Sequence, residues 1–473
     1  MSKEFLFLLP LWIIIVGSLL ILIMEAIFKE FGRKIAFSFS FLILLIAFLV
    51  QIFVYNSTLD YGKDILLFYN TVKITSLTNL FILSSIFAVL LTVLFSEQYL
   101  IEHQSITGEY YFLLFMVLAG MINLIVANEL LTFFVGLELM SIASYVLTGY
   151  YRVKEQSIEA AIKYYLPGVF STGLILMGIA FIYGITGTTF FDQISFSLTR
   201  KIHLQNAFYV GFLFLLSGVA FKLTFVPFHS YAPDVYQGAS APISGLLSTG
   251  IKVAVFASFV RIYGEAIPLS ADWNDVFITL SILTMFVGNI MALKQDNIKR
   301  MLAYSSIAHA GYILVAFVSF KNASLRDIYF SVGFYLFSYT FMTLGAFGLL
   351  GWFSRKDEKY TYLHDLSGIS KSYPWMSLAM AVFMFSLTGF PPTAGFFAKY
   401  YIFRLAIQSG YTWLAIVAIL NSFLSAYYYL RVIIYMIMNK EQEIALSNLN
   451  NSFKIAVLLC ILGIFVLPFI AFP

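Results

Sequence analysis

The sequence predicts an all-α integral membrane protein with about fourteen transmembrane helices, and three observations support this fold class. Of the 473 residues, 61% are apolar and only 11% are charged, whereas soluble domains carry about 25% charged residues. The apolar residues gather in runs of about 20 or more, the length that a helix needs to cross a bilayer. Two short passages also recur at a constant spacing, which indicates an internal duplication.

Charged residues, Pro, Gly and Asn divide the chain into fourteen apolar runs, each expected to form one helix. The first run is longer than the core of a signal peptide and lacks a small-residue cleavage site, so we expect it to be retained. Only Asn128 and Glu129 separate the fourth and fifth runs, which leaves thirteen as an alternative count. The runs are 5–28, 35–54, 74–95, 110–127, 129–150, 158–184, 207–226, 241–262, 273–293, 299–320, 327–353, 375–408, 412–436 and 452–472.

The two recurring passages predict an inverted repeat. Residues 140–144 (MSIAS) resemble residues 305–309 (SSIAH), and residues 223–227 (LTFVP) resemble residues 387–391 (LTGFP), at offsets of 165 and 164. Such an offset implies a five-helix unit used twice, and because five is odd, the second copy must cross the membrane upside down. Pro breaks a helix, so Pro227 and the pair at 391–392 predict two broken helices. In transport folds such broken helices line the path of the transported ion or substrate.

The repeat divides the chain into four regions. Excess Lys and Arg in alternate loops, such as those with Arg33, Arg152 and Arg300, predicts that both termini lie outside. The regions are amino-terminal helices (1–109), a first five-helix repeat (110–262), a second, inverted five-helix repeat (273–436) and a carboxy-terminal helix (437–473).

Five charged residues fall inside the apolar runs: Glu138, Lys163, Lys222, Lys252 and Lys399. A charge at the bilayer centre costs at least about 2.5–3.5 kcal/mol, so packing alone does not explain five of them. Burial brings the pKa of an amine down and that of a carboxyl up, so that both can exchange protons near neutral pH. The pattern therefore predicts a path for protons.

Structural alternatives stay open for several of these residues. Glu138 and Lys222 could be structural counter-ions of each other. Lys163 could snorkel toward the interface or pair with Glu159 at i, i+4. Lys399 could snorkel if its helix is broken early.

Two histidines are further candidates. His229 follows Pro227 by two residues and titrates near neutral pH, which suits a proton relay, although it could instead satisfy carbonyls of the broken helix. His309 lies near Ser305 and Ser306 and could be a hydrogen-bonded core residue or a relay. Two other features are interpreted structurally: Asp234 as a helix cap or loop residue, and tyrosines 427–429 as packing and an interfacial anchor.

The composition argues against other classes of protein. The net charge of +4 is small and no long basic cluster occurs, so nucleic acid is not an expected partner. Cys460 is the only cysteine, which excludes an intrachain disulfide and an all-Cys iron–sulfur cluster. With no GxGxxG fingerprint and no credible haem pair, no cofactor is expected in this chain.

Three passages resemble the antiporter-like membrane subunits of respiratory complex I. They are VGLELMSIASY at 135–145, FKLTFVPFH at 221–229 with APDVY at 232–236, and TGFPPTAGFFAK at 388–399, and the resemblance extends from about residue 74 to 440. It implies proton translocation, redox chemistry confined to other subunits, further antiporter-like subunits among the partners, and a bacterial inner membrane as the location.

The resemblance also assigns roles to the charged residues. It implies that Glu138 corresponds to the glutamate that the family carries in its fifth helix. The family's lysines in the sixth, seventh, eighth and twelfth helices would then be, in that order, Lys163, Lys222, Lys252 and Lys399. The residue 165 positions after the glutamate is an alanine, so the second repeat has no matching carboxylate and the two repeats are not expected to do the same job.

Three other functions stay open at this point. A subunit of a multisubunit cation/proton antiporter would share the fold and the lysines, and sodium dependence would distinguish it. A redox subunit that binds quinone or haem would show an absorbance spectrum. A purely structural scaffold disagrees with lysines in the middle of the membrane.

Overall fold

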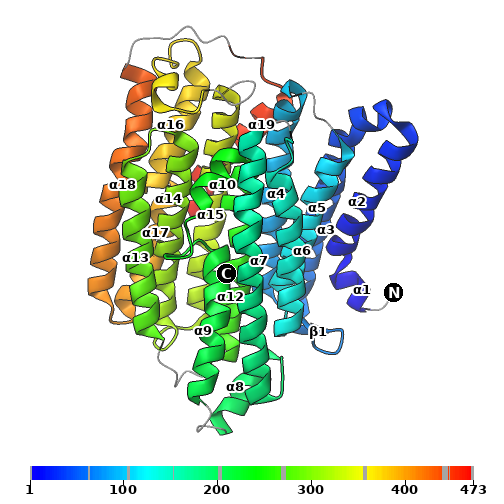
Figure 1. The fold of residues 1–473 in the computed structure, drawn as a ribbon, viewed down its shortest axis with the longest axis vertical. Helices are drawn as coiled ribbons and strands as arrows, with labels where there is room; N and C mark the ends of the chain where they lie inside the picture. Colours follow the sequence, from blue (N-terminus) through cyan, green and yellow to red (C-terminus); the bar gives the residue numbers. More distant parts are fainter. Residues whose placement is uncertain are drawn as a thin grey trace.

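The computed structural model describes residues 3–61, 64–103, 107–152, 154–200, 205–267, 273–354, 360–438, 446 and 448–469, which form an upright bundle of helices (Figure 1). Within these residues, twelve helices are long and apolar enough to cross a membrane. The predicted runs 207–226 and 375–408 contain shorter apolar helices, Asn206–Lys222 and Pro374–Thr388. The all-helical membrane fold is confirmed, while the count of fourteen spans stays a prediction.

The amino-terminal region begins with a short helix and continues with three long ones. These are α1 (Lys3–Phe7), α2 (Leu9–Phe28), α3 (Glu30–Tyr61) and α4 (Ser76–Glu102). The last region holds α19 (Asn451–Val466), and 3-10 turns occur at Val315–Ser319, Leu363–Leu366 and Leu467–Phe469.

Two sets of helices between these regions correspond at an offset of about 165 residues. The first set is α5 (Gly108–Val126), α6 (Leu130–Thr148), α7 (Glu155–Thr186), α9 (Gln205–Lys222) with α10 (Ala232–Gly238), and α11 (Ala241–Ser248) with α12 (Gly250–Arg261). The second set is α13 (Asn274–Leu293), α14 (Ile298–Leu314), α15 (Leu325–Phe353), α16 (Pro374–Thr388) with α17 (Ala394–Gln408), and α18 (Thr412–Met438). In Figure 1 the chain rises from α9 to α10 and descends from α16 to α17, which agrees with an inverted repeat.

Both predicted helix breaks are present, and a third was not predicted. The chain leaves helical geometry between α9 and α10 and between α16 and α17, around the prolines. The eighth run, expected to be one helix, is also interrupted at Thr249, between α11 and α12, and ends in a π-helical segment at Ile262–Ala266. The hydroxyls of Ser248 and Thr249 both donate to the carbonyl of Gly245. Such hydrogen bonds from side chains compete with the backbone hydrogen bonds of the helix. A helix can therefore be interrupted here without a proline.

Two small elements also lie outside the prediction of helical spans. Strands β1 (Ile65–Leu67) and β2 (Val72–Ile74) form an antiparallel hairpin between α3 and α4. Helix α8 (Phe191–Arg200) buries Ile194 and Leu198 on one face, as expected for an amphipathic surface helix.

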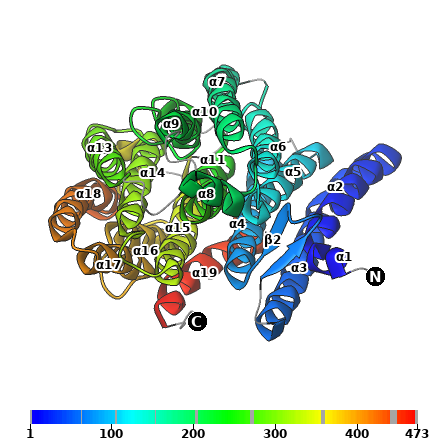
Figure 2. The same ribbon diagram turned by 90° about the horizontal axis from the view of Figure 1, so that it is seen from below.

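The most deeply buried helices lie in the middle of the bundle. In Ala241–Ala266 and Ile298–Ser319, every residue of the apolar 18-residue stretch that could cross the membrane is buried. In Leu9–Phe28 only 22% of the corresponding stretch is buried. Viewed from below, α11, α14 and α15 lie inside, with α2 at one margin and α18 at the other (Figure 2). Polar side chains on the central helices are therefore shielded from lipid by the outer helices.

Candidate functional site

Lys222 ends α9 and places its ammonium group among aromatic rings of the first repeat. Its Nζ donates a 2.7 Å hydrogen bond to the hydroxyl of Tyr145, and it lies 4.8 Å from the centre of that ring and 5.6 Å from the ring of Tyr164. The negative faces of aromatic rings attract cations. Among the described residues, no carboxylate lies within ion-pair distance of this lysine. A hydroxyl and π-faces, rather than a direct counter-ion, hold the charge.

Glu138 lies on α6 and is half-buried. Its carboxylate accepts a 2.7 Å hydrogen bond from the hydroxyl of Thr172 on α7. Tyr145 lies seven residues further along α6, about two helical turns away on the same face, and the charge of Glu138 is close enough to act on Lys222. One helix therefore carries both the carboxylate and the hydroxyl that holds the lysine.

Lys252 lies at the start of α12, just after the break at Thr249, and is 2% exposed. Its Nζ donates to the hydroxyl of Thr224 at 2.9 Å and to the hydroxyl and carbonyl oxygens of Ser306 at 2.7 and 2.8 Å. An ammonium has three protons to donate, so these three acceptors satisfy it without a carboxylate. Because Thr224 belongs to the first repeat and Ser306 to the second, Lys252 lies at the junction between the repeats.

His309 lies on α14 between two tyrosine hydroxyls. Its Nδ1 is 2.7 Å from the hydroxyl of Tyr335 and its Nε2 is 3.2 Å from that of Tyr429. The hydroxyl of Tyr429 is also hydrogen-bonded to Ser305. Ser305 and Ser306, which lie near His309 in the sequence, are instead hydrogen-bonded to Tyr429 and to Lys252. A ring with a hydroxyl at each nitrogen can take a proton on one side and release it on the other.

Lys399 lies on α17 and binds the end of the helix before it. Its Nζ donates to the carbonyl oxygens of Leu387 and Thr388 at 3.2 and 2.7 Å and to the hydroxyl of Ser422 at 2.7 Å. These carbonyls end α16, where they lack partners within the helix. The residue is 5% exposed, so the alternative of snorkelling is wrong. A cavity of about 840 Å³ bordered by α16, α17 and α18 reaches the lysine.

Lys163 lies apart from the buried lysines. Its side chain is 44% exposed and forms ion pairs of 2.7 Å with Glu159 and with Asp234. Asp234 also pairs with Arg300 of α14 at 2.5 Å. The sequence alternative of a pair with Glu159 is confirmed, and the interpretation of Asp234 as a cap or loop residue misses that it bridges the two repeats. A role for Lys163 in proton transfer stays a prediction.

His229 lies in the break between α9 and α10 and is half-buried. Among the described residues, its Nδ1 has no hydrogen-bond partner. The carbonyl of Phe221, freed by the break, accepts a 2.8 Å hydrogen bond from the hydroxyl of Tyr231. A role for His229 as a relay stays a prediction.

Sequence reasoning missed the hydroxyl groups that connect the charged residues. They are Tyr145, Thr172, Thr224, Tyr335 and Tyr429. The interpretation of tyrosines 427–429 as packing is incomplete for Tyr429, which is fully buried and hydrogen-bonded. The one available signal was the spacing of seven residues between Glu138 and Tyr145, which places both on one helix face.

The geometry around these side chains suits the movement of protons. Hydroxyl groups both donate and accept hydrogen bonds, so they can receive a proton from an ammonium and pass another on. Across the described ranges, no group of three or more His, Cys, Asp or Glu side chains is placed to hold a metal ion.

Comparison with known proteins identifies relatives across most of the chain. NADH-quinone oxidoreductase subunit N of Trichlorobacter lovleyi is 45% identical over 385 residues, which cover 81% of this chain and 78% of that protein. A chain of respiratory complex I from Thermus thermophilus matches with a TM-score of 0.80 at 29% identity, over 97% of both chains. A chain of the Mrp complex from Dietzia shares the fold, with a TM-score of 0.81 at 21% identity over 93% of this chain and 82% of that one.

A family model provides the assignment for the central part of the chain. The model described as "NADH:quinone oxidoreductase/Mrp antiporter, TM" matches residues 127–425. This range contains Glu138 and every lysine and histidine considered above. The chain therefore belongs to the NADH:quinone oxidoreductase/Mrp antiporter family of membrane proteins.

Proposed function

We propose that this chain translocates protons across a bacterial inner membrane as a membrane-arm subunit of NADH–quinone oxidoreductase. Its relatives at 45% and 42% identity are both named subunit N of that enzyme. In this proposal NADH oxidation and quinone reduction occur in other subunits, and the chain packs against further antiporter-like membrane subunits. The multi-pass helical fold supports the membrane location.

The observation that carries the proposal is a set of three lysines buried in the bundle and bound to hydroxyl and carbonyl groups. Lys222, Lys252 and Lys399 are 3%, 2% and 5% exposed. Among the described residues, none of the three has a carboxylate at ion-pair distance. A buried ammonium without a counter-ion loses its proton more readily than one in water. Each lysine can therefore alternate between charged and neutral forms, as a relay requires.

The hydrogen bonds suggest an order for the relay. Lys222 exchanges a proton within the first repeat, where Glu138 acts on its charge. Lys252 passes protons between the repeats, because its partners belong to both. His309 lies where the charges of Lys252 and Lys399 both act on it, and the last lysine borders the cavity beside α18.

Proton uptake by vesicles that contain the assembled complex tests this function. NADH is added outside, and a pH-sensitive dye reports the proton movement. We expect acidification of the lumen that is unchanged when choline replaces sodium. Transport that requires sodium would contradict the proposal and favour the cation/proton antiporter.

Gly168→Ala is expected to lower the rate of proton translocation about tenfold. A well-placed proton-transfer group contributes at least about a hundredfold, and this substitution only displaces such a group. A Cβ atom at Gly168 would lie 2.1 Å from the hydroxyl oxygen of Tyr145, so the ring must move away from Lys222. Gly173→Ala is the matched control on the same helix, because its Cβ would meet nothing within 4 Å. Equal pumping by both variants in assembled complex would show that the position of Tyr145 is unimportant.

Lys163→Gln is expected to change the rate of proton translocation by less than about twofold, because an ion pair exposed at the surface contributes little free energy. The residue is half-exposed and its partners Glu159 and Asp234 lie at the surface of the bundle. The same vesicle assay checks this. A loss as large as that of a buried lysine would place Lys163 within the relay.

A further inference from the structure

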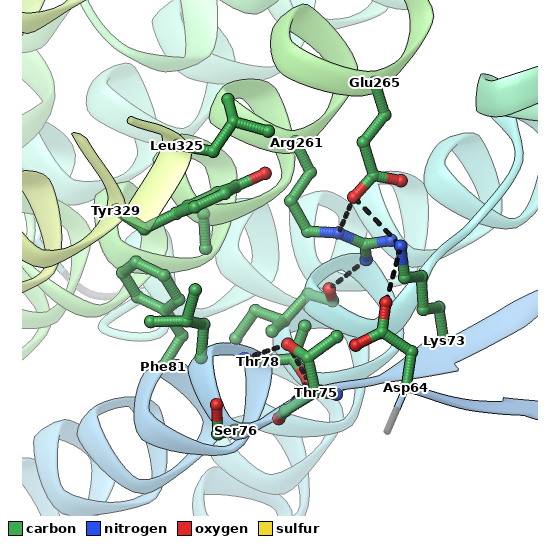
Figure 3. A pocket seen from close by; sticks show the side chains of 13 residues that line it. Asp64, Lys73, Thr75, Ser76, Thr78, Phe81, Arg261, Glu265, Leu325 and Tyr329 are labelled. Atoms are coloured by element: carbon green, nitrogen blue, oxygen red, sulfur yellow. Dashed lines mark hydrogen bonds and ion pairs between the residues drawn. The ribbon is translucent and has the colours of Figure 1, made fainter. Parts of the chain in front are cut away.

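A pocket with charges of both signs lies at the end of the bundle that carries the β-hairpin. It has a volume of about 240 Å³ and is bordered by β2, α4, the π-helical segment after α12 and the start of α15 (Figure 3). The ammonium of Lys73 lies 3.1 Å from the carboxylate of Asp64 and 3.4 Å from that of Glu265. Arg261 lies 3.4 Å from the same glutamate, and it also donates to two backbone carbonyls at the end of α5. The pocket thus offers both a cation and carboxylates at its mouth.

An apolar groove continues from this pocket toward the middle of the membrane. It has a volume of about 260 Å³ and is lined by side chains of α3, α4 and α15, and Leu77, Phe81 and Tyr329 line both the pocket and the groove. Along α15 the groove runs from Arg326 to Phe337, which is roughly 16 Å at the rise of an α-helix. That length is about half of the 30 Å hydrocarbon core of a bilayer. The groove therefore has the depth of one leaflet.

The charges at the open end are balanced. Arg326 is exposed and, within the described ranges, forms no ion pair. The side chains of Lys73 and Glu265 are each 20% exposed, and that of Asp64 is 57% exposed. Lys73 thus stands beside two accessible carboxylates in the pocket, Arg326 adds a second accessible cation in the adjoining groove, and Arg261 is held by the backbone.

We propose that the pocket and groove bind one phospholipid with a zwitterionic phosphate–amine headgroup, from the leaflet on the side of the chain's amino terminus. Lys73 and Arg326 would receive the phosphate, Asp64 and Glu265 the amine, and the groove one acyl chain. A purely anionic headgroup would place its charge beside the carboxylates of Asp64 and Glu265, and like charges at close range repel. The lipid fills the space between α3 and α15, so it joins the amino-terminal helices to the second repeat. The inference does not rest on proton translocation.

Filling the groove tests the proposal. The intact complex is purified in detergent, incubated with phosphatidylethanolamine or phosphatidylglycerol of equal chain length, washed, and analysed for retained lipid by mass spectrometry. Gly333 lines the groove, and a Cβ there would lie 3.4 Å from Phe81, an ordinary contact. We therefore expect Gly333→Ala to retain lipid like the unaltered chain, and Gly333→Leu to retain one phosphatidylethanolamine fewer per complex. Equal retention by Gly333→Leu, or equal retention of phosphatidylglycerol, would overturn the proposal.

A change at the headgroup end provides a second test that does not depend on packing. Arg326→Gln removes one charged donor and is expected to weaken retention of phosphatidylethanolamine about tenfold, the usual effect of losing a hydrogen bond to a charged group. Lys321→Gln, in the turn just before α15 and outside the groove, is the control. If Arg326→Gln retains the lipid as tightly as this control, the proposed headgroup site is wrong.

Discussion

Lys222→Met is expected to lower NADH-driven proton translocation by the assembled complex on the order of a hundredfold, since general acid–base groups contribute that much or more. Met is unbranched and fills irregular space well, so it can occupy the volume of the lysine stem among Tyr145, Tyr164 and Phe221. It removes a buried ammonium group that has no carboxylate at ion-pair distance among the described residues. Assembly should therefore survive while proton transfer stops.

Three measurements on the same preparation check this prediction. They are proton uptake by vesicles, NADH–quinone turnover, and the amount of assembled complex. Lys294→Met, at an exposed position, is the control for replacing a lysine. Normal proton uptake by fully assembled Lys222→Met complex would mean that this lysine only supports the structure.

Lys399→Met is expected to stop proton translocation to a similar degree and, in addition, to lower the thermal stability of the chain. The lysine donates to the carbonyls of Leu387 and Thr388 at the end of α16. A buried acceptor that loses its donor costs about 1–3 kcal/mol. Proton transfer and helix termination therefore depend on the same ammonium group.

Lys399→Arg separates the two roles. A guanidinium keeps hydrogen-bond donors for the carbonyls but stays charged at any physiological pH, so we expect partial recovery of thermal stability without recovery of pumping. Thermal unfolding of the purified complex and proton uptake by vesicles measure the two quantities. If the Met variant kept both its stability and its pumping, the assignment of Lys399 would be wrong.

The spans and the buried lysines could be predicted from the sequence because both depend on local composition. A run of about 20 apolar residues has to form a helix in a bilayer, and a lysine in the middle of such a run is necessarily buried. Lys252 follows this rule, whereas Lys222 and Lys399 lie nearer the ends of their runs and are buried because the helix breaks leave those positions inside the bundle. Lys163 is not buried, because it lies near the start of its run, where a long side chain reaches charged partners at the surface.

The hydrogen-bonding partners could not be predicted, because they depend on how distant helices meet. Tyr429 is separated from Ser305 by 124 positions, and a buried tyrosine at helical spacing usually serves packing alone. The break at Thr249 was missed since neither Ser nor Thr is a strong helix breaker by itself. The β-hairpin was missed because strands of three residues carry almost no periodic signal.

The sequence also distinguished this chain within its family. The passages APDVY at 232–236 and NSFLSAYYYL at 421–430 look more like subunit N of NADH–quinone oxidoreductase than like the other antiporter-like subunits. Relatives named subunit N in Trichlorobacter lovleyi and Salinibacter ruber confirm that prediction.

The central claim is that the buried lysines release and regain protons, rather than merely providing positive charge. Proton uptake by vesicles with the assembled Lys222→Arg complex tests it most directly, because arginine keeps the charge but does not release its proton at physiological pH. The account predicts that proton uptake falls as far as in Lys222→Met while the complex remains assembled. Proton uptake by the arginine variant at the rate of the unaltered chain would contradict it.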